Sequence, residues 1–204
     1  MKLYYTPGVC SLSPHIILKE SGLPHSLVKT DIRSKTIDGG ADYKSKNPLG
    51  YVPALELEDG TLLTEGPAIV QYIADKAPDK NLAPANGTLD RYKMQSWLNF
   101  VSTELHKGGF SPLFNPALAD DVKKVFRDRL MTRLDHLENH LKKNDYLLGS
   151  KFSLPDAYLF TVLRWTVPMK IDLTPYPAIQ AYQKRIAARP GVQAAMSAEG
   201  LPAA

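Results

Sequence analysis

The chain has 204 residues, of which 44% are hydrophobic and 23% are charged, and it carries a formal net charge of +4. This composition is typical of a soluble globular protein with one large or two small domains, and it excludes a disordered or fibrous chain. The positive excess lies after residue 80 and is spread along helical stretches, so we expect a solvated helix face and no nucleic-acid partner.

The sequence also bears on membranes and compartment. No run of residues approaches the roughly 18 apolar positions that a membrane-spanning helix needs. The stretch MKLYYTPG has one lysine and lacks the apolar core of a signal peptide. The single cysteine, Cys10, cannot form an internal disulfide, which favours a reducing compartment. We therefore expect a cytoplasmic protein with no membrane partner.

The first 80 residues alternate strand patterns with helical ones. KLYYT and SLVKTD are rich in strand formers, and between them residues 12–20 predict a helix that ends at Gly22. The polar stretch 31–48 is too rich in Gly, Asp and Lys for a core element. VPALELEDGTLLTE predicts a hairpin that turns at Asp59-Gly60, and GPAIVQYIADKAP predicts a helix with proline in its first turn. This order predicts an α/β layer architecture.

A polar linker, DKNLAPANG at residues 79–87, predicts a domain boundary, with residues 1–80 before it, 81–87 as the connection and 88–204 after it. Beyond the linker the pattern is helical. A first long helix is predicted from Thr88 to His106. Apolar residues three and four apart predict a second, with one face formed by Val122, Val125, Phe126, Leu130, Leu134, Leu137 and Leu141.

Two further signals lie near the carboxyl end. Ser153-Leu-Pro-Asp156 fits a capping box, in which the serine oxygen accepts from the backbone N–H of Asp156 and the carboxylate reaches back. It opens the apolar helix AYLFTVLRW. The last predicted helix runs from Ala178 to about Ala188 and stops before Arg189-Pro-Gly. The chain thus reads as a small α/β domain followed by an all-helical one.

The position of Cys10 favours a reactive thiol, although a lone cysteine is most often a small buried hydrophobe. It follows a Thr-Pro-Gly turn and falls at the amino end of the first predicted helix, where the helix dipole favours a thiolate. Lowering a cysteine pKa from about 8.5 to about 6.5 needs roughly 2.7 kcal/mol. A helix terminus supplies about 0.3 to 1 kcal/mol and at best about 2. A hydroxyl, an N–H group or a cation such as Lys35 must supply the rest, so position alone leaves both interpretations open.

The run Cys10-Ser-Leu-Ser13 has the spacing of a redox Cys-x-x-Cys motif with serine in place of the second thiol. Such a site forms a mixed disulfide but cannot resolve it internally, because the chain has no other cysteine. Turnover therefore needs an external thiol, and glutathione is the abundant cytosolic one.

Three stretches carry a family resemblance: LYYTPGVCSLSPHI, NPLGYVPALELEDGTLLTEGPAIVQYI and SLPDAYLF. Together they resemble the cytosolic glutathione transferases, most closely the bacterial beta class, which has a cysteine at the position of Cys10. The resemblance covers essentially the whole chain. It implies a thioredoxin-like domain followed by an all-helical domain that contributes the electrophile site, and a homodimer. It also implies an enzyme that conjugates glutathione, as cosubstrate, to hydrophobic electrophilic small molecules, with no metal.

The resemblance assigns glutathione-binding roles in the first domain. Val52-Pro53 matches the family's cis-proline, where the backbone of the preceding residue pairs with the cysteinyl part of glutathione. Glu65 matches the carboxylate that meets the γ-glutamyl ammonium, and residue 66 offers a helix-start N–H. Gly66 replaces the usual serine, so a hydroxyl contact is lost. Lys35 matches the cation for the glycyl carboxylate, although a loop lysine by itself is usually solvated.

The resemblance also assigns residues near the end of the first long helix, a region that in similar enzymes reaches the active site, partly from the neighbouring subunit. The glutathione-binding candidates there are Asn99, Thr103, Glu104, Leu105, His106 and Lys107. By helical spacing Asn99, Thr103, His106 and Lys107 are expected to share one face. With Cys10, His106 is the catalytic candidate, for polarising the thiol. The alternative is an exposed helical histidine.

Aromatic residues are the remaining candidates. Phe110, Phe114 and Trp165 are expected to line the apolar pocket for the electrophile, with core packing as the alternative. Tyr5 matches the tyrosine that is catalytic in other classes, but beside this cysteine we expect a structural role.

Two mechanisms stay open at this point. In one, Cys10 hydrogen-bonds to a bound glutathione thiolate; in the other, Cys10 itself becomes glutathionylated and a second glutathione releases it. Two other functions are also compatible with the sequence: a non-catalytic ligand-binding or stress protein on the same fold, and a dedicated glutaredoxin-like thioltransferase.

Overall fold

The structure is a computed structural model that describes residues 1–202. In this range the chain forms two compact units: unit 1, of residues 1–83 and 188–202, and unit 2, Pro84–Ala187. The sequence placed everything after residue 88 in the helical domain, whereas the structure groups residues 188–202 with unit 1. Residues 203 and 204 of that predicted domain lie outside the described residues.

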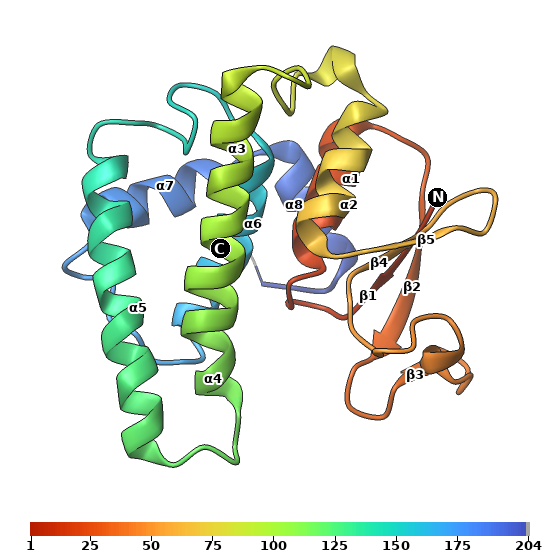
Figure 1. Cartoon of the computed structure of the whole chain (residues 1–204), viewed down its shortest axis with the longest axis horizontal. Helices are drawn as coiled ribbons and strands as arrows, with labels where there is room; N and C mark the ends of the chain where they lie inside the picture. The colour runs from red at the N-terminus through yellow and green to blue at the C-terminus, as the bar shows by residue number, and fades with distance from the viewer. Residues whose placement is uncertain (203–204) are drawn as a thin grey trace. The chain divides into compact units, whose positions relative to one another are not determined.

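Unit 1 is built on a mixed sheet of five strands in the order β3-β2-β1-β4-β5 among the described residues (Figure 1). The strands are β1 (Lys2–Tyr5), β2 (Ser26–Asp31), β3 (Thr36–Ile37), β4 (Ala54–Glu56) and β5 (Leu62–Thr64). β1 pairs with β2 in parallel, and the other neighbours are antiparallel. The predicted strands KLYYT and SLVKTD and the predicted hairpin are therefore confirmed, with Gly60 at positive φ in the hairpin turn.

Three helices pack in unit 1: α1 (Leu12–Ser21), α2 (Gly66–Asp75) and α8 (Pro190–Ala198). α1 contacts both α2 and α8, α2 contacts β4 and β5, and Figure 1 shows all three on one side of the sheet. The first two match the predicted helices, and α1 ends at Gly22 in the left-handed conformation that glycine adopts without strain.

The opposite side of the sheet is covered by the segment that the sequence left outside the core. Tyr43, in a short 3-10 helix (Tyr43–Ser45), is fully buried and packs with Tyr4, Val52 and Ala54. Most polar residues of this segment are exposed or half-buried, so its composition did not indicate the buried Tyr43 and Asn47. The expectation of no core element between residues 31 and 48 was wrong.

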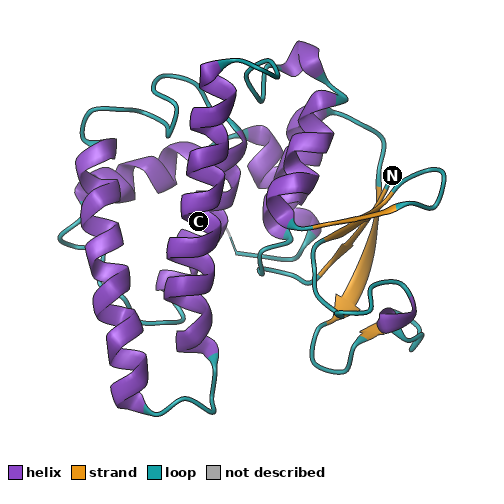
Figure 2. Ribbon diagram, in the orientation of Figure 1, coloured by secondary structure: helices purple, strands orange, loops and turns teal. Residues whose placement is uncertain are grey.

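Unit 2 is entirely helix and loop in the described residues (Figure 2). Its helices are α3 (Leu89–Phe100), a π-helix (Val101–Phe110), α4 (Ser111–Phe114), α5 (Asp120–Leu141), α6 (Leu154–Leu163), a 3-10 turn (Arg164–Thr166) and α7 (Pro177–Ala187). The α/β-plus-all-α fold class is confirmed, with an all-helical unit after a thioredoxin-like one.

The helix predictions in unit 2 hold with two changes. The capping box at the start of α6 is present in both directions between Ser153 and Asp156. The buried face of α5 begins only at Leu130, because Val122 and Val125 are exposed. The predicted single helix to His106 changes to π geometry at Val101, which alters which residues share a face.

α8 was not predicted from the sequence. It begins directly after Arg189, with Pro190 at its first position, where a proline loses no hydrogen bond. We expected the chain to stop being helical at this Arg-Pro-Gly stretch, since Pro and Gly usually follow a helix. Here the proline starts a new helix instead.

Candidate functional site

Cys10 lies in the turn between β1 and α1, as predicted. The Leu12 N–H donates to the Val9 carbonyl and the Ser13 N–H to the Cys10 carbonyl, which winds the chain into α1. The cysteine is half-buried, and its thiol donates to the backbone carbonyl of Val52, 3.2 Å away. The thiol therefore reaches a loop that is distant in sequence and is not a fully buried core group.

The Val52-Pro53 peptide bond is cis, which agrees with the family pattern. Two side chains hold the loop before it: the Tyr43 hydroxyl and the Asn47 amide both donate to the Tyr51 carbonyl, each at 2.8 Å. The backbone of Val52 is thus fixed beside the Cys10 sulfur.

Glu65 and Gly66 lie at the start of α2, next to Pro53. The Glu65 carbonyl accepts from the N–H groups of the first helical turn, and its side chain is exposed. Its φ of 66° is uncommon for a residue with a side chain. A Cβ added to Gly66 would lie 3.8 Å from Pro53 Cγ, an ordinary contact. Position 66, where glycine replaces the serine of the family pattern, therefore has room for a serine side chain.

Lys35 is not a freely solvated loop lysine. Its ammonium donates to the Gly50 carbonyl at 2.9 Å and lies 5.3 Å from the centre of the Tyr51 ring. These contacts hold Lys35 against the loop that leads to Val52. Unit 1 thus brings its predicted site residues together, linked through Val52 and Pro53.

Ser13 and Tyr5 are two further buried side chains near Cys10 in the sequence. Ser13 is buried, and its Oγ has no hydrogen-bond partner in the described residues, so it does not bond to the Cys10 thiol there. Tyr5 is buried, and desolvation, with the charges of Glu199 and Asp38 adding to it, raises the pKa of its phenol. A raised pKa disfavours a phenolate, which supports the structural role expected for Tyr5.

In unit 2 the predicted residues divide between two faces. Asn99, Thr103 and Lys107 are exposed, and the Thr103 hydroxyl donates to the Asn99 carbonyl. Leu105 and His106 are buried. The expectation that His106 shares the exposed face was wrong, because the π-helix has a wider turn than the α-helical spacing assumed.

His106 is enclosed by aromatic groups of unit 2. Its Nδ1 lies 2.6 Å from the Tyr158 hydroxyl, and its ring centre is 4.9 Å from that of Trp165. Desolvation, with a smaller contribution from the charge of Lys107, lowers the pKa of His106 to about 4. The imidazole is therefore neutral at pH 7 and acts as a hydrogen-bonding group, not as a cation.

Glu104 is engaged within its own unit. Its carboxylate accepts from Arg129 at 2.9 Å and from Arg133 at 2.7 Å. These two hydrogen bonds, Arg129 first, lower its pKa, so it stays ionised. Glu104 therefore pairs with two arginines of α5, a contact that was not predicted from the sequence.

The three aromatic candidates do meet. The rings of Phe110 and Phe114 each lie 5.8 Å from Trp165 in edge-to-face geometry. Phe110 is fully buried, which is core packing, whereas Phe114 is 45% exposed and offers an apolar surface. Tyr158 is the residue that sequence reasoning missed, since it lies in the apolar run AYLFTVL with nothing to mark its hydroxyl.

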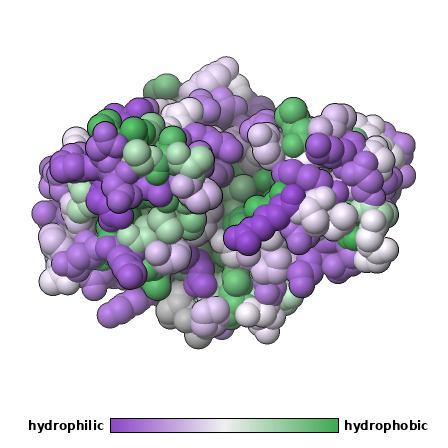
Figure 3. All heavy atoms as spheres, turned by 90° about the horizontal axis from the view of Figure 1, so that it is seen from below, coloured by the Kyte–Doolittle hydropathy of each residue, from purple (hydrophilic) through white to green (hydrophobic). Residues whose placement is uncertain are grey.

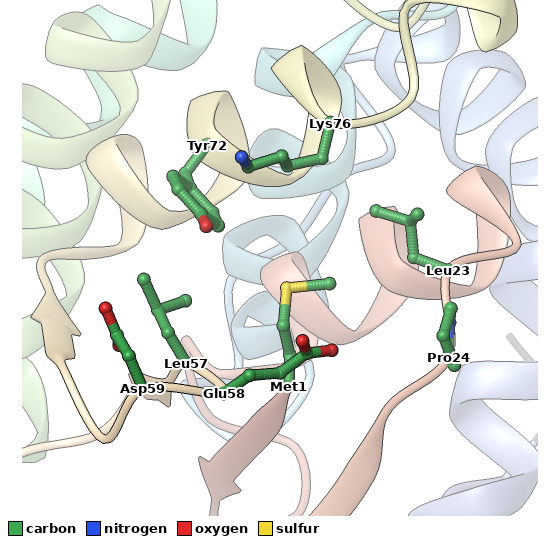
Figure 4. Close-up of a pocket in the computed structure, with 8 residues that line it drawn as sticks. All are labelled: Met1, Leu23, Pro24, Leu57, Glu58, Asp59, Tyr72 and Lys76. Atoms are coloured by element: carbon green, nitrogen blue, oxygen red, sulfur yellow. The ribbon is translucent and has the colours of Figure 1, made fainter.

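A separate cavity of about 420 Å³ lies at the other end of the sheet (Figure 4). Its walls combine the start of β1, the α1–β2 turn, the β4–β5 hairpin and α2, with none of the predicted site residues among them. The lining residues are Met1, Leu23, Pro24, Leu57, Glu58, Asp59, Tyr72 and Lys76. Met1 precedes β1 and Leu57 follows the antiparallel β4. The cavity therefore lies at the end of these strands opposite to the end where Cys10 and Val52 lie.

Residues 1–202 hold neither a cluster of metal-binding side chains nor a membrane-spanning helix. No group of three or more His, Cys, Asp or Glu residues in this part of the chain is placed to hold a metal ion. None of the helices described there combines the length and apolarity that crossing a membrane requires.

Comparison with known proteins gives consistent matches. The domain family "Glutathione S-transferase, N-terminal domain" matches residues 9–76, and "Glutathione S-transferase, C-terminal domain" matches residues 103–190. The chain is 49% identical to glutathione S-transferase GstA of Escherichia coli O157:H7, over 98% of this chain and 100% of that protein.

Two solved structures are similar over nearly their whole length. One is a sphingomonad glutathione S-transferase complexed with glutathione, and the other is a bacterial beta class glutathione S-transferase of Sphingomonas chungbukensis. Each is 46% identical, with a TM-score of 0.95, and covers 99% of this chain and 100% of the other.

Proposed function

The chain belongs to the glutathione S-transferase family, with the bacterial beta class as its structural neighbours, and we propose that it conjugates glutathione to hydrophobic electrophiles at a site centred on Cys10. It is a glutathione transferase and uses glutathione as cosubstrate. The single observation that carries the Cys10 proposal is the 3.2 Å contact of its thiol with the carbonyl of Val52.

The Val52 contact matters because of what that backbone does in the proposed complex. The N–H and C=O of Val52 pair with the cysteinyl residue of glutathione. A cysteinyl group held there has its sulfur close to Cys10, because the same carbonyl is already within reach of the thiol. Cys10 can then donate a hydrogen bond to the glutathione thiolate or exchange with a glutathione disulfide.

Unit 1 can match the charged groups of glutathione, which are an ammonium and a carboxylate at the γ-glutamyl end and a carboxylate at the glycyl end. Glu65, exposed at the start of α2, takes the γ-glutamyl ammonium, and the backbone N–H of Gly66 takes the neighbouring carboxylate. Lys35 takes the glycyl carboxylate, since its ammonium is already placed on the loop before Val52. Hydrogen bonds to charged groups are the stronger class, so these contacts give most of the polar affinity.

The helical unit supplies the remaining proposed groups. Asn99, Thr103 and Lys107 offer exposed polar side chains to glutathione, and Phe114 offers apolar surface to the electrophile. His106 takes part as a neutral hydrogen-bonding group.

Three other candidates of the helical unit are less suited to contact glutathione or the electrophile directly. Leu105 is fully buried and has only its backbone to offer, and Glu104 is held by two arginines. Trp165 serves mainly to pack His106.

The Cys-x-x-Ser motif favours a second chemistry at the same thiol. The Cys10 thiolate attacks the glutathione sulfur of a mixed disulfide between glutathione and another thiol, the S–S bond breaks, and the products are the Cys10–glutathione mixed disulfide and the other thiolate. A glutathione thiolate then attacks the Cys10–glutathione mixed disulfide, restores Cys10 and forms glutathione disulfide. Glutathione is the reductant of the substrate disulfide, and no other oxidant or reductant is needed.

We also propose a cytoplasmic homodimer. Large hydrophobic side chains remain exposed on both units, including Tyr51 on unit 1 and Tyr92 and Val125 on unit 2. Figure 3 shows hydrophobic groups gathered among hydrophilic ones on one face of the helical unit. Burying such groups against a second copy is favourable. Light scattering on the purified chain tests the stoichiometry, and a monomer at micromolar concentration would contradict it.

The experiment on Cys10 combines mass and turnover. Wild type, Cys10→Ala and Ser13→Ala are incubated with glutathione disulfide and weighed intact without reductant, and thiol conjugation is assayed in parallel. We expect an adduct of one glutathione on wild type and on Ser13→Ala and none on Cys10→Ala. Conjugation should fall by about 10- to 100-fold in Cys10→Ala, because the hydrogen bond to the charged glutathione thiolate is lost.

The outcomes separate the alternatives. No adduct on wild type would exclude the mixed-disulfide route and leave Cys10 as a hydrogen-bond donor. Full conjugation by Cys10→Ala would contradict both roles. Retention on immobilised glutathione without turnover would point to a carrier, and disulfide reduction far above conjugation would point to a thioltransferase.

A further inference from the structure

The segment after unit 2 returns to the loop that carries Cys10. α8 packs along α1, and at its beginning Arg189 pairs with Glu20 through two hydrogen bonds of 2.9 and 2.7 Å. At its other end the chain reaches Glu199, whose side chain is fully buried. A carboxylate that is taken out of water in this way needs compensating partners.

Both partners of Glu199 flank Cys10 in sequence. The Gly8 N–H donates to Oε2 at 2.9 Å, and His15 Nδ1 lies 2.9 Å from Oε1. We assign a proton to His15 Nδ1, because the atom that faces it is a carboxylate oxygen. One buried side chain thus binds the chain two residues before Cys10 and again five residues after it.

The loop between these points is held at a second place. The Thr6 N–H donates to Ser11 Oγ at 3.1 Å, and the Ser11 hydroxyl donates back to the Thr6 carbonyl at 3.0 Å. Gly8, at the top of the loop, has φ +73°, and a Cβ there would meet a Leu201 methyl at 3.2 Å. The conformation of Thr6–Ser11 therefore depends on Ser11 within the loop and on the Glu199 region outside it.

Stability alone does not account for the His15–Glu199 pair. His15 is fully buried, and within residues 1–202 its Nε2 has no hydrogen-bond partner. A buried polar pair that leaves one atom without a partner loses the hydrogen bond which that atom makes in water. What the pair does achieve is a fixed position for the Gly8 N–H.

We propose that Glu199 is a positioning residue for Cys10: by holding Gly8 and His15 it fixes the Thr6–Ser11 loop so that the Cys10 sulfur faces the Val52 carbonyl. The proposal rests on the function proposed above, in which Cys10 meets the glutathione sulfur. Glu199 acts on Cys10 through its bonds to Gly8 and His15. The reactivity of the amino-terminal thiol therefore depends on the last helix of the chain.

The test uses the full chain, in which Cys10 is the only thiol. Glu199→Gln keeps the side-chain volume but has one acceptor oxygen in place of two. Glu20→Gln is the matched control: it loosens the same helix α8 at Arg189 without touching the loop. The rate constant for alkylation of Cys10 by iodoacetamide is measured at pH 7 for each variant, with thermal unfolding alongside.

We expect Glu199→Gln to alkylate at least about fivefold more slowly than wild type, because the released loop no longer keeps the sulfur at the start of α1. The alkylation rate constant of Glu20→Gln should stay within about twofold of wild type, even if its unfolding temperature falls as much as that of Glu199→Gln. In conjugation, Glu199→Gln should lower kcat while the KM for glutathione stays within about twofold.

Four results would overturn the proposal: an unchanged rate in Glu199→Gln, a faster rate, an equal fall in Glu20→Gln, or a loss confined to KM. A faster rate would mean that the carboxylate acts on the thiol only through its charge. If Glu199→Gln fails to fold, Gly8→Ala disturbs the same contact with the pair intact and must show the same slow alkylation. Since alkylation needs no glutathione, a wild type without conjugation would contradict the proposed function and leave this test standing.

Discussion

The two units present their candidate residues in opposite ways. Unit 1 uses the backbone: the cis peptide before Pro53, the helix-start N–H of Gly66 and a thiol at the end of a tight loop. Its charged candidates, Lys35 and Glu65, stay at least partly exposed. Unit 2 instead buries its central candidate, His106, in an aromatic cluster on a π-helix.

This contrast predicts where a substitution changes glutathione binding and where it changes stability. In unit 1 a change to an exposed side chain should alter glutathione binding with little effect on unfolding, because little packing is lost. In unit 2 a change to a buried polar group should alter stability first, because burial leaves its partners unsatisfied.

Asp156→Ala tests the unit 2 side and has the largest expected effect. The carboxylate accepts from the Leu147 N–H, the Ser153 N–H and the Tyr182 hydroxyl, all in a buried site. Removing it leaves these donors unpaired and should lower the free energy of unfolding by about 3 to 5 kcal/mol. Urea denaturation measures this.

The control is Asp145→Ala, which breaks an exposed pair with Arg185 and should cost about 0 to 1 kcal/mol. Equal losses in the two variants would contradict the difference between buried and exposed groups. So would an Asp156→Ala protein that stays folded but loses its affinity for glutathione.

His106 should make stability depend on pH. Its pKa in the folded protein, about 4, is below the unfolded value of 6.5. The stability that the neutral imidazole contributes is therefore complete above pH 6.5 and is lost as the pH falls toward 4. Between pH 7 and pH 5 the free energy of unfolding should fall by about 2 kcal/mol. His106→Gln, which keeps a hydrogen-bonding side chain but does not titrate, should show that much less pH dependence in urea unfolding.

The other histidines titrate in both proteins and cancel in this comparison. Parallel pH curves for wild type and His106→Gln would mean that the imidazole is hydrated and its pKa ordinary. An NMR titration of the His106 ring gives the same answer directly, with no protonation expected down to about pH 5.

Lys35→Met tests the prediction that exposed side chains of unit 1 affect glutathione binding and not stability. It keeps an apolar stem beside Tyr51 and removes only the ammonium, so glutathione should bind about 5- to 10-fold more weakly, about 1 to 1.4 kcal/mol. Calorimetry measures the affinity, and thermal unfolding should be nearly unchanged. Lys29→Met, on the exposed side of β2, controls for the lost charge.

A glutathione amidated at its glycyl carboxylate sharpens this prediction. It should bind wild type and Lys35→Met equally, since the charge that Lys35 meets is gone. A persistent difference would assign the effect to the loop that Lys35 holds through Gly50.

Gly66→Ser has the smallest expected effect and the opposite sign. The site has room for a side chain, with Pro53 Cγ 3.8 Å from the new Cβ, and a serine restores the hydroxyl that the family pattern has. Glutathione should bind about fivefold more tightly, about 1 kcal/mol. Gly66→Ala fills the same space without the hydroxyl, and equal affinities for the two variants would exclude a hydroxyl contact.

Much of unit 1 follows from local sequence signals. Asp59-Gly60 forms the hairpin turn, Gly22 ends α1 and the proline after Gly66 starts α2, because each signal acts within a few residues. The capping box of Ser153 and Asp156 is equally local. Tyr43 was missed because its burial depends on a sheet face that the surrounding polar residues do not indicate.

The α/β and helical parts, the turn that precedes α1 at Cys10, and the family with its glutathione cosubstrate all follow from the amino-acid sequence alone. Three other features depend on tertiary packing: the thiol meets Val52, His106 is buried and neutral beside Tyr158, and Glu199 returns to Gly8. Turns and caps involve neighbours in the chain, whereas burial and long-range hydrogen bonds depend on which segments pack together.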